Sequence, residues 1–201
     1  GQEARANSVA FNNDGTRMFV AGVGNYRLEQ DRIHEYSLDT AFDLSSRTHL
    51  NTEEMSSFQS YIDGVTFKDD GTKMYTIDNE SNLISQFKLT TPYDVSTLSL
   101  EGTYNIDSHD TEGREVAFSN DGSKMFFIGD ANDKVYEFNL SCNWSIIDGA
   151  CDDPADDKEI SSSIESQTET AKQIAIQAST PVLNRMYWLR RHRTSDQLSN
   201  Q

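Results

Sequence analysis

The sequence predicts a mainly β protein in which a four-stranded antiparallel unit is repeated three times. Three segments share one pattern, Val-x-Phe-x-x-Asp-Gly followed by Ser or Thr, a basic residue and Met. Their Asp-Gly pairs begin at Asp14, Asp70 and Asp121, so the repeat period is 56 residues and then 51. Strand-rich repeats of about 50 residues are typical of propellers and arrays, in which each unit buries a face against the next.

The residues around each Asp-Gly pair predict a β-hairpin. In the middle repeat, residues 65–67 and 73–77 are two strand-like runs that flank Asp70 and Gly71. Asp-Gly between such runs predicts a type I′ turn, which requires positive φ at both central residues.

A third strand is predicted in each repeat, at residues 32–38, 83–89 and 134–140. Three apolar residues align between the repeats, and the last two of each set lie two apart, which predicts a face that points into the core. These residues are Ile33, Tyr36 and Leu38, then Ile84, Phe87 and Leu89, and then Val135, Phe138 and Leu140.

A polar turn at residues 91–97, echoed at 40–46, leads to a fourth strand from about 98 to 104. Four antiparallel strands per repeat make one propeller blade. In the third repeat a different segment, Ser-Cys-Asn-Trp-Ser at 141–145, replaces this turn. The sequence therefore leaves the fourth strand of the third repeat open.

The turn and the two strand motifs together resemble the WD40-like propeller repeats of bacterial extracellular proteins, over residues 8 to about 145. The resemblance implies three four-stranded propeller-type blades. Closed propellers have four to eight blades, so three blades leave exposed edges. The expected solutions are further repeats in a longer precursor, an open stacked array, or a partial propeller completed by oligomerisation, and self-association is the favoured one.

The composition divides the chain into a repeat region, a connector and a tail. The expected domain is 1–151, with repeats at about 8–61, 62–111 and 112–151, followed by an acidic connector at 152–159 and a helical tail at 160–201. In the tail, Thr180-Pro181 precedes an amphipathic, basic segment at 182–193 that predicts a helix. Residues 184–201 resemble the passenger–translocator junction of autotransporters, which implies a passenger protein. The alternative is a helix that docks on the propeller or on a neighbouring subunit.

Charge and cysteine content limit the function classes. The formal net charge is −16, with +3 in residues 182–201 and −19 in residues 1–181, so phosphate-backbone binding to nucleic acid is not expected. Insertion into a membrane is not expected either, because no stretch approaches the roughly 18 apolar residues that a spanning helix needs. Cys142 and Cys151 predict a disulfide and an oxidising compartment, with two unpaired thiols as the alternative.

The sequence contains no nucleophile elbow, phosphate-binding loop or histidine pair with metal-ligand spacing, so we expect no enzyme activity. Calcium is the one candidate cofactor, because two acidic loops could supply oxygen ligands, although solvated carboxylates are the alternative. The candidate ligands are Asp107, Asp110, Glu112, Asp130, Asn132 and Asp133. Tyr26, Phe42, Tyr93 and Trp144 fall in turns and could stack on a sugar, but equivalent repeat positions favour packing of Phe42 and Tyr93 under the turn.

These observations predict a secreted or cell-surface, non-enzymatic protein that mediates adhesion or self-assembly into an extracellular structure such as a filament. The expected partners are other copies of the chain and a cell-surface glycan or protein. The basic, aromatic tail would contact the acidic repeats of a neighbour. Its contact residues would be Arg185, Tyr187, Trp188, Arg190 and Arg191. The alternative is a periplasmic or secreted propeller enzyme with an acidic, calcium-dependent site at the channel rim.

Overall fold

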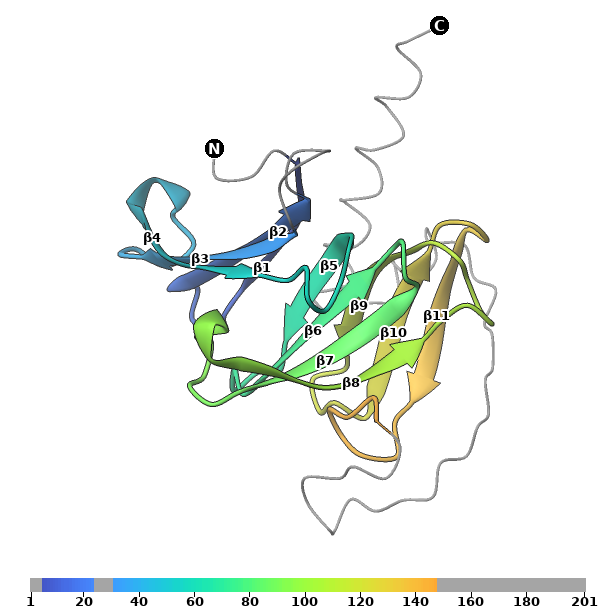
Figure 1. Cartoon of the computed structure of the whole chain (residues 1–201). Helices are drawn as coiled ribbons and strands as arrows, with labels where there is room; N and C mark the ends of the chain where they lie inside the picture. Colours follow the sequence, from blue (N-terminus) through green and yellow to red (C-terminus); the bar gives the residue numbers. More distant parts are fainter. Residues whose placement is uncertain (1–4, 24–30, 148–201) are drawn as a thin grey trace, which may run out of the picture.

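The computed structural model describes residues 5–23 and 31–147, which form three antiparallel sheets (Figure 1). The first sheet has the order β1-β2-β3-β4, with β1 Arg5–Phe11, β2 Arg17–Val23, β3 Arg32–Leu38 and β4 Arg47–Glu54. The second has the order β5-β6-β7-β8, with β5 Ile62–Phe67, β6 Lys73–Asp78, β7 Leu83–Leu89 and β8 Leu98–Asn105. The third has the order β11-β10-β9, with β9 Gly113–Phe118, β10 Lys124–Gly129 and β11 Lys134–Asn139.

The three sheets are consistent with partial propeller blades, and they confirm the mainly β, antiparallel architecture. Short 3-10 turns, η1 Leu44–Ser46 and η2 Val95–Thr97, precede β4 and β8. The predicted connector and helical tail lie outside the described residues, so the division of the chain into those parts stays a prediction. Within residues 5–23 and 31–147, no helix has the length and apolar character needed to cross a membrane.

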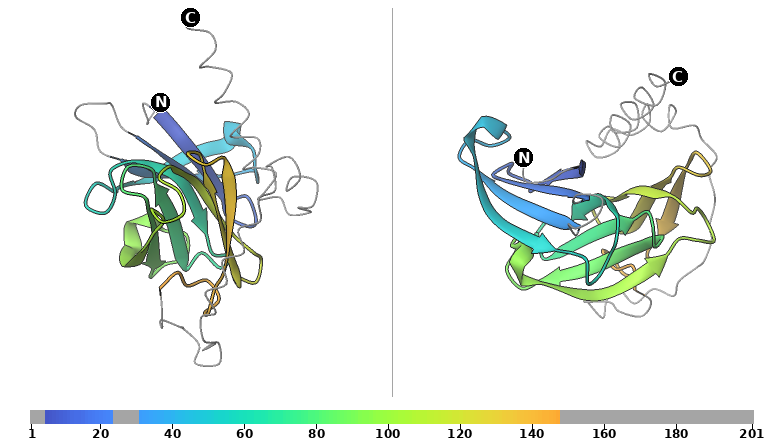
Figure 2. Two further views of the ribbon diagram at one scale, coloured as in Figure 1. Left: turned by 90° about the vertical axis from the view of Figure 1, so that its right-hand side faces the viewer. Right: turned by 45° about the horizontal axis from the view of Figure 1, so that its top comes forward.

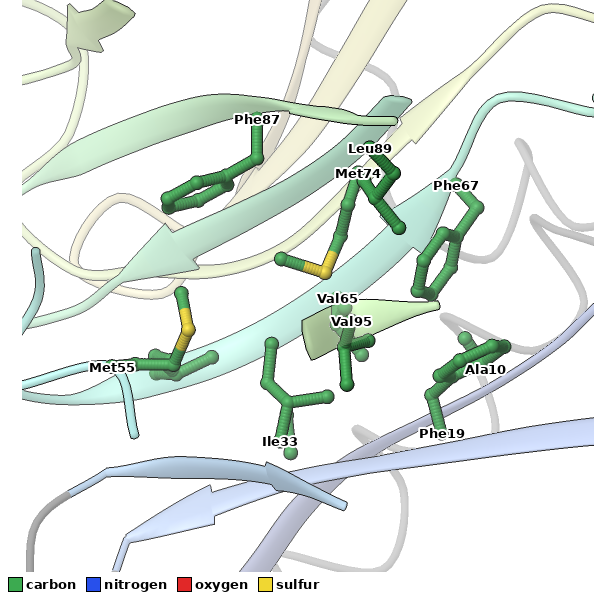
Figure 3. Packing of buried hydrophobic residues seen from close by; sticks show 12 residues of the cluster. Ala10, Phe19, Ile33, Met55, Val65, Phe67, Met74, Phe87, Leu89 and Val95 are labelled. Carbon is green, nitrogen blue, oxygen red and sulfur yellow. The ribbon is translucent and has the colours of Figure 1, made fainter. Parts of the chain in front are cut away.

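The sheets stack side by side and meet along their first strands, β1, β5 and β9 (Figures 1 and 2). One apolar cluster joins the first and second sheets and includes Phe19, Ile33 and Met74 (Figure 3). A second cluster joins the second and third sheets and includes Tyr75 and Phe127. The second sheet is therefore covered on both faces.

The third strand of the second sheet is buried on both of its faces. Phe87 and Leu89 lie in the cluster shared with the first sheet, whereas Ile84 lies in the cluster shared with the third. Successive side chains of a strand point to opposite faces, so residues three apart cannot share one. Phe87 and Leu89, which lie two apart, share one face as predicted, and Ile84 is buried on the opposite face because the central sheet is covered on both sides.

The Asp-Gly turns form, but they are not type I′. Only the glycine of each pair has positive φ, 72° at Gly15 and at Gly71 and 70° at Gly122. In the first turn the Gly15 amide donates to the Asn12 carbonyl at 3.1 Å, as in a type I turn that ends on glycine. The Asp14 carboxylate accepts from the amide and hydroxyl of Thr16 at 2.9 and 2.6 Å. The aspartate thus serves as a hydrogen-bond acceptor rather than as a residue with positive φ.

An aromatic ring covers each of these glycines. Phe42, Tyr93 and Trp144 have φ of 60°, 63° and 60°, and each ring lies over the glycine of its own repeat. A Cβ added at Gly71 would lie 2.2 Å from the Tyr93 ring. This agrees with the expectation that Phe42 and Tyr93 pack against the turn. Tyr26 lies outside the described residues.

Candidate binding surface

The six residues predicted to ligate calcium lie in two loops at one end of the third sheet. Residues 106–112 connect β8 to β9, and residues 130–133 connect β10 to β11. The structure brings the loops together: the Asp130 amide donates to the Glu112 carbonyl at 2.8 Å, and Asn132 Nδ2 donates to the His109 carbonyl at 3.1 Å. Two segments that the sequence singled out separately therefore form one surface.

Asp110 holds the two loops to each other. Its side chain is buried and accepts hydrogen bonds from the amides of Glu112, Ala131 and Asn132 at 3.0, 3.2 and 3.1 Å. The Tyr136 hydroxyl donates to the same carboxylate at 3.3 Å. Burial, with a contribution from the charge of Asp110, raises the pKa of Tyr136 above its usual value, so this hydroxyl stays protonated. A buried carboxylate with four donors makes the loop pair a defined structure.

Arg114, on β9, is the cation of this surface and is shared by three carboxylates. Its guanidinium donates to Asp63 at 2.7 Å, to Glu112 at 2.7 Å and to Asp130 at 3.1 Å. Burial alone would lower the pKa of Arg114, but the hydrogen bond that Arg114 donates to Asp63 and the charges of Asp63 and Asp130 raise it above the ordinary value. Arg114 therefore carries its charge at every physiological pH, and that charge is already balanced.

Four exposed carboxylates surround this pair of loops, and we call them the acidic rim. The acidic rim consists of Asp107, Glu112, Asp130 and Asp133. With Asp63 and Asp110 included, six carboxylates belong to this surface, where the cations are Arg114 and Lys134. The rim is therefore a region of negative potential.

The geometry of this surface is that of a hydrogen-bonded loop pair. Asp110 binds amides and a hydroxyl, Glu112 and Asp130 bind Arg114, and Asp107 accepts from the Asn105 side chain at 3.0 Å. In residues 5–23 and 31–147, no group of three or more His, Cys, Asp or Glu side chains is arranged to hold a metal ion. Calcium binding by the six predicted residues stays a prediction.

Sequence reasoning missed the residues on the first strands. Arg114 and Asp63 lie on β9 and β5, and next to them Ser8 donates to the buried carboxylate of Glu115 at 3.4 Å. A Cβ added at Gly64 would lie 2.7 Å from Glu115 Oε1, so the glycine makes room for this contact. The sequence signal that could have indicated these residues is a pair of positions that differs between the repeats, at 7 and 8, 63 and 64, and 114 and 115.

The outer side of the third sheet differs from that of its two neighbours. In the first two sheets the third strand pairs with an outer strand, β3 with β4 and β7 with β8. In the described part of the chain, β11 pairs with β10 alone. Within the described residues the third sheet has three strands, so the fourth strand that the sequence left open is not present there.

Two other predicted features reach beyond the described residues. Cys142 is buried and disulfide-bonded, while its predicted partner Cys151 lies outside the described ranges, so the pairing stays a prediction. The proposed contact residues of the tail also lie outside them. These are Arg185, Tyr187, Trp188, Arg190 and Arg191.

Comparison with known proteins finds similar structures but no similar sequences. No protein-family model matches the sequence, and no curated protein matches it. Sqt1 from Chaetomium thermophilum matches with 16% identity and a TM-score of 0.45, over 67% of this chain and 30% of the other. Sqt1 bound to the N-terminus of the ribosomal protein L10 matches with 16% identity and a TM-score of 0.44, over 66% and 30%. The match spans less than a third of the Sqt1 chain.

The similar structures do not support the predicted biological setting. One of them is Sqt1 bound to the N-terminus of the ribosomal protein L10, whereas the sequence predicted extracellular adhesion, self-association and a glycan partner. The predictions of an extracellular or cell-surface location, of adhesion and of self-assembly into a homo-oligomer or filament are corrected accordingly and are not retained. The alternative of a secreted enzyme is not retained either. The resemblance to autotransporter passengers is unsupported. The absence of enzyme activity is compatible with the comparison and stays a prediction.

Proposed function

We propose that the described part of the chain is a non-catalytic protein-binding module whose acidic rim takes a positively charged segment of a partner protein. The observation that carries the proposal is the excess of carboxylates over cations at the rim. The one arginine beside it, Arg114, is already bonded to Asp63, Glu112 and Asp130. The exposed carboxylates Asp107 and Asp133 add further negative charge to the rim.

The rigidity of the loops supports this use of the charge. Because Asp110 ties both loops together from a buried position, the rim carboxylates are presented without ordering a flexible segment on binding. A preformed surface avoids part of the conformational cost of association. Clustered charges of one sign also accelerate encounter with an oppositely charged partner and make the affinity salt-dependent.

The test measures binding of an octalysine peptide to the full chain by calorimetry, at low and at high salt, with octaglutamate as the control peptide. The rim variant is Asp107→Ser with Asp133→Asn, which installs the residues that stand 51 positions earlier in the chain, Ser56 and Asn82. Two exposed charges at about 0.2–1 kcal/mol each predict an affinity loss of about 2- to 30-fold.

The matched control removes two exposed charges at the opposite end of the sheets, by Asp39→Asn with Asp69→Asn. We expect this control to change octalysine affinity less than about 2-fold. Equal losses in the two double variants would show that only the net charge matters. That result, or binding of octaglutamate as tight as that of octalysine, contradicts the proposal.

A further inference from the structure

We infer that the outer edge of β11 binds an extended segment of a partner protein, which joins the third sheet as an antiparallel fourth strand with basic residues at its carboxyl end. This inference rests on the proposed function, because it states how the positively charged partner segment lies. The occupant is a strand of another protein.

The position of β11 in its sheet matches that of β7 in the second sheet. Met125 of β10 is paired with Phe138 of β11, as Met74 of β6 is paired with Phe87 of β7. On its other side β7 is paired with β8 from Leu83 to Leu89. In residues 5–23 and 31–147, no strand occupies the corresponding side of β11. An edge of this kind presents backbone donors and acceptors to an added strand.

The turn after β11 is built like the turn that precedes β8. The Trp144 amide donates to the Gly122 carbonyl at 2.9 Å, as the Tyr93 amide donates to the Gly71 carbonyl at 2.9 Å. The third repeat thus reproduces the second as far as the contact between Trp144 and Gly122. Only the strand itself is missing from the described part of the chain.

The sequence that follows this turn is a poor candidate for the missing strand. The residues at the positions equivalent to β8 are 149–156, Gly-Ala-Cys-Asp-Asp-Pro-Ala-Asp. Gly, Asp and Pro are depleted in strands, and proline has no amide hydrogen to donate to a ladder. The edge therefore suits a strand supplied by another protein better than one supplied by these residues.

The register of β8 on β7 determines the chemistry of the occupant. Asn105 lies opposite Leu83 and Leu98 opposite Leu89, so the carboxyl end of the outer strand lies beside the first residue of the inner one. In the third sheet that end lies opposite Lys134, next to Asp133 of the acidic rim. A strand followed by several basic residues would pair with β11 and place its cations among the rim carboxylates, which outnumber Lys134.

The experiment uses the full chain and a synthetic peptide with the sequence of residues 98–105 followed by three lysines, since β8 is the strand that fits this position in the second sheet. Amide hydrogen exchange is measured with and without the peptide. We expect exchange within residues 134–139 to slow by more than about 10-fold at saturation. Residues 83–89, already paired on both sides, serve as the internal control and should not change.

Two control peptides separate this inference from the proposed function. One has proline in place of the residue equivalent to Thr103, and the other ends in three glutamates. If the lysine and proline peptides bind equally and exchange at 134–139 is unchanged, strand addition is overturned while binding to the rim stands. If the lysine and glutamate peptides slow exchange equally, the charge-based function is overturned while strand addition stands.

Discussion

In the second and third sheets a buried aspartate joins the same two loops, but the aspartate comes from a different element in each. In the second sheet, Asp78 at the end of β6 accepts from the amides of Ser60, Tyr61, Glu80 and Ser81 at 2.7–2.8 Å and so ties the loop before β5 to the loop after β6. In the third sheet, Asp110 of the loop before β9 ties the equivalent pair of loops.

The carboxylate occupies a different one of two equivalent positions in each sheet. Asp78 of the second sheet is equivalent to Gly129 of the third, and Gln59, before the second sheet, is equivalent to Asp110, before the third. A Cβ added at Gly129 would lie 2.2 Å from Asp110 Oδ2, so the carboxylate of Asp110 fills the space that a side chain at 129 would enter. The repeats therefore share the location of a buried carboxylate, while the residue that supplies it differs.

The two sheets also differ in enclosure. Every residue of β6 is buried, because sheets lie against both faces of the second sheet. In the third sheet, Phe126 is only partly buried although it occupies the position of Tyr75. A side chain at the same repeat position should therefore contribute differently to the free energy of unfolding in the two sheets. Mutations at matched positions can measure this difference.

The largest expected effect is the contrast between Tyr75→Ala and Phe126→Ala. Tyr75 is fully buried, packs on Phe118 with ring centroids 4.2 Å apart and donates to the Trp144 carbonyl. Its removal should lower the free energy of unfolding by about 3–5 kcal/mol. Phe126→Ala should lower it by about 1 kcal/mol. Urea unfolding of both variants checks this, and equal losses would show that the far face of the third sheet is as enclosed as the second sheet.

The exchanged carboxylates predict strong coupling between positions 110 and 129. Asp110→Gln should cost about 2–3 kcal/mol because several buried donors lose their acceptor. Gly129→Asp alone should also destabilise, since its side chain collides with Asp110. The double variant recreates the pair Asp78 and Gln59 found beside the second sheet and should regain more than 1 kcal/mol of the summed losses. A double-mutant cycle measures this coupling, and additive losses would refute the exchange.

A smaller contrast concerns the side chains in the middle of β7 and β11. Gln86 Oε1 accepts the amide of Ile146, in the segment after β11, at 2.9 Å, whereas Glu137, at the equivalent position, pairs with Lys124 of its own sheet. Gln86→Ala leaves a buried amide without an acceptor and should cost about 1–2 kcal/mol. Glu137→Ala should stay within about 0.5 kcal/mol. Thermal unfolding of the two variants distinguishes them, and a larger loss for Glu137→Ala would reverse the comparison.

The smallest expected effect is a pH dependence of the stability, which comes from His109 beside the third sheet. His109 packs edge-on against Phe138 at 5.2 Å, as Phe58 packs against Phe87 at 5.4 Å. Burial lowers the pKa of His109 below its usual 6.5, so the folded state favours the neutral ring. The stability is complete above pH 6.5 and declines as the pH falls below it. His109→Phe should therefore flatten urea-unfolding midpoints between pH 7 and pH 5, and an unchanged slope would contradict this assignment.

Much of the fold could be predicted from local pattern. The third strand over residues 83–89 and the fourth from about 98 match β7 and β8, because apolar and β-branched runs between turn residues specify strands locally. The Asp-Gly hairpins were also predictable, but their turn type was not. Whether Asp14 adopts positive φ depends on the hydrogen bonds that its carboxylate makes with Thr16.

The candidate surface could be predicted only in part. The six carboxylate and amide residues of the two loops were singled out, and the loops do meet. Arg114 was missed, as was the difference between buried Asp110 and the exposed rim, because neither follows from residue type. Contacts between residues 63 and 114, or 110 and 131, join segments far apart in the chain.

The sequence alone determined the repeat, the strands and the excess of acidic charge, since each depends on residues close together in the chain. Only the tertiary structure decided which faces are buried, which carboxylate ties each loop pair and which strand edge remains open in the described residues. Those properties arise from packing between sheets. A strand with one pattern is enclosed when a neighbour covers it and exposed when none does.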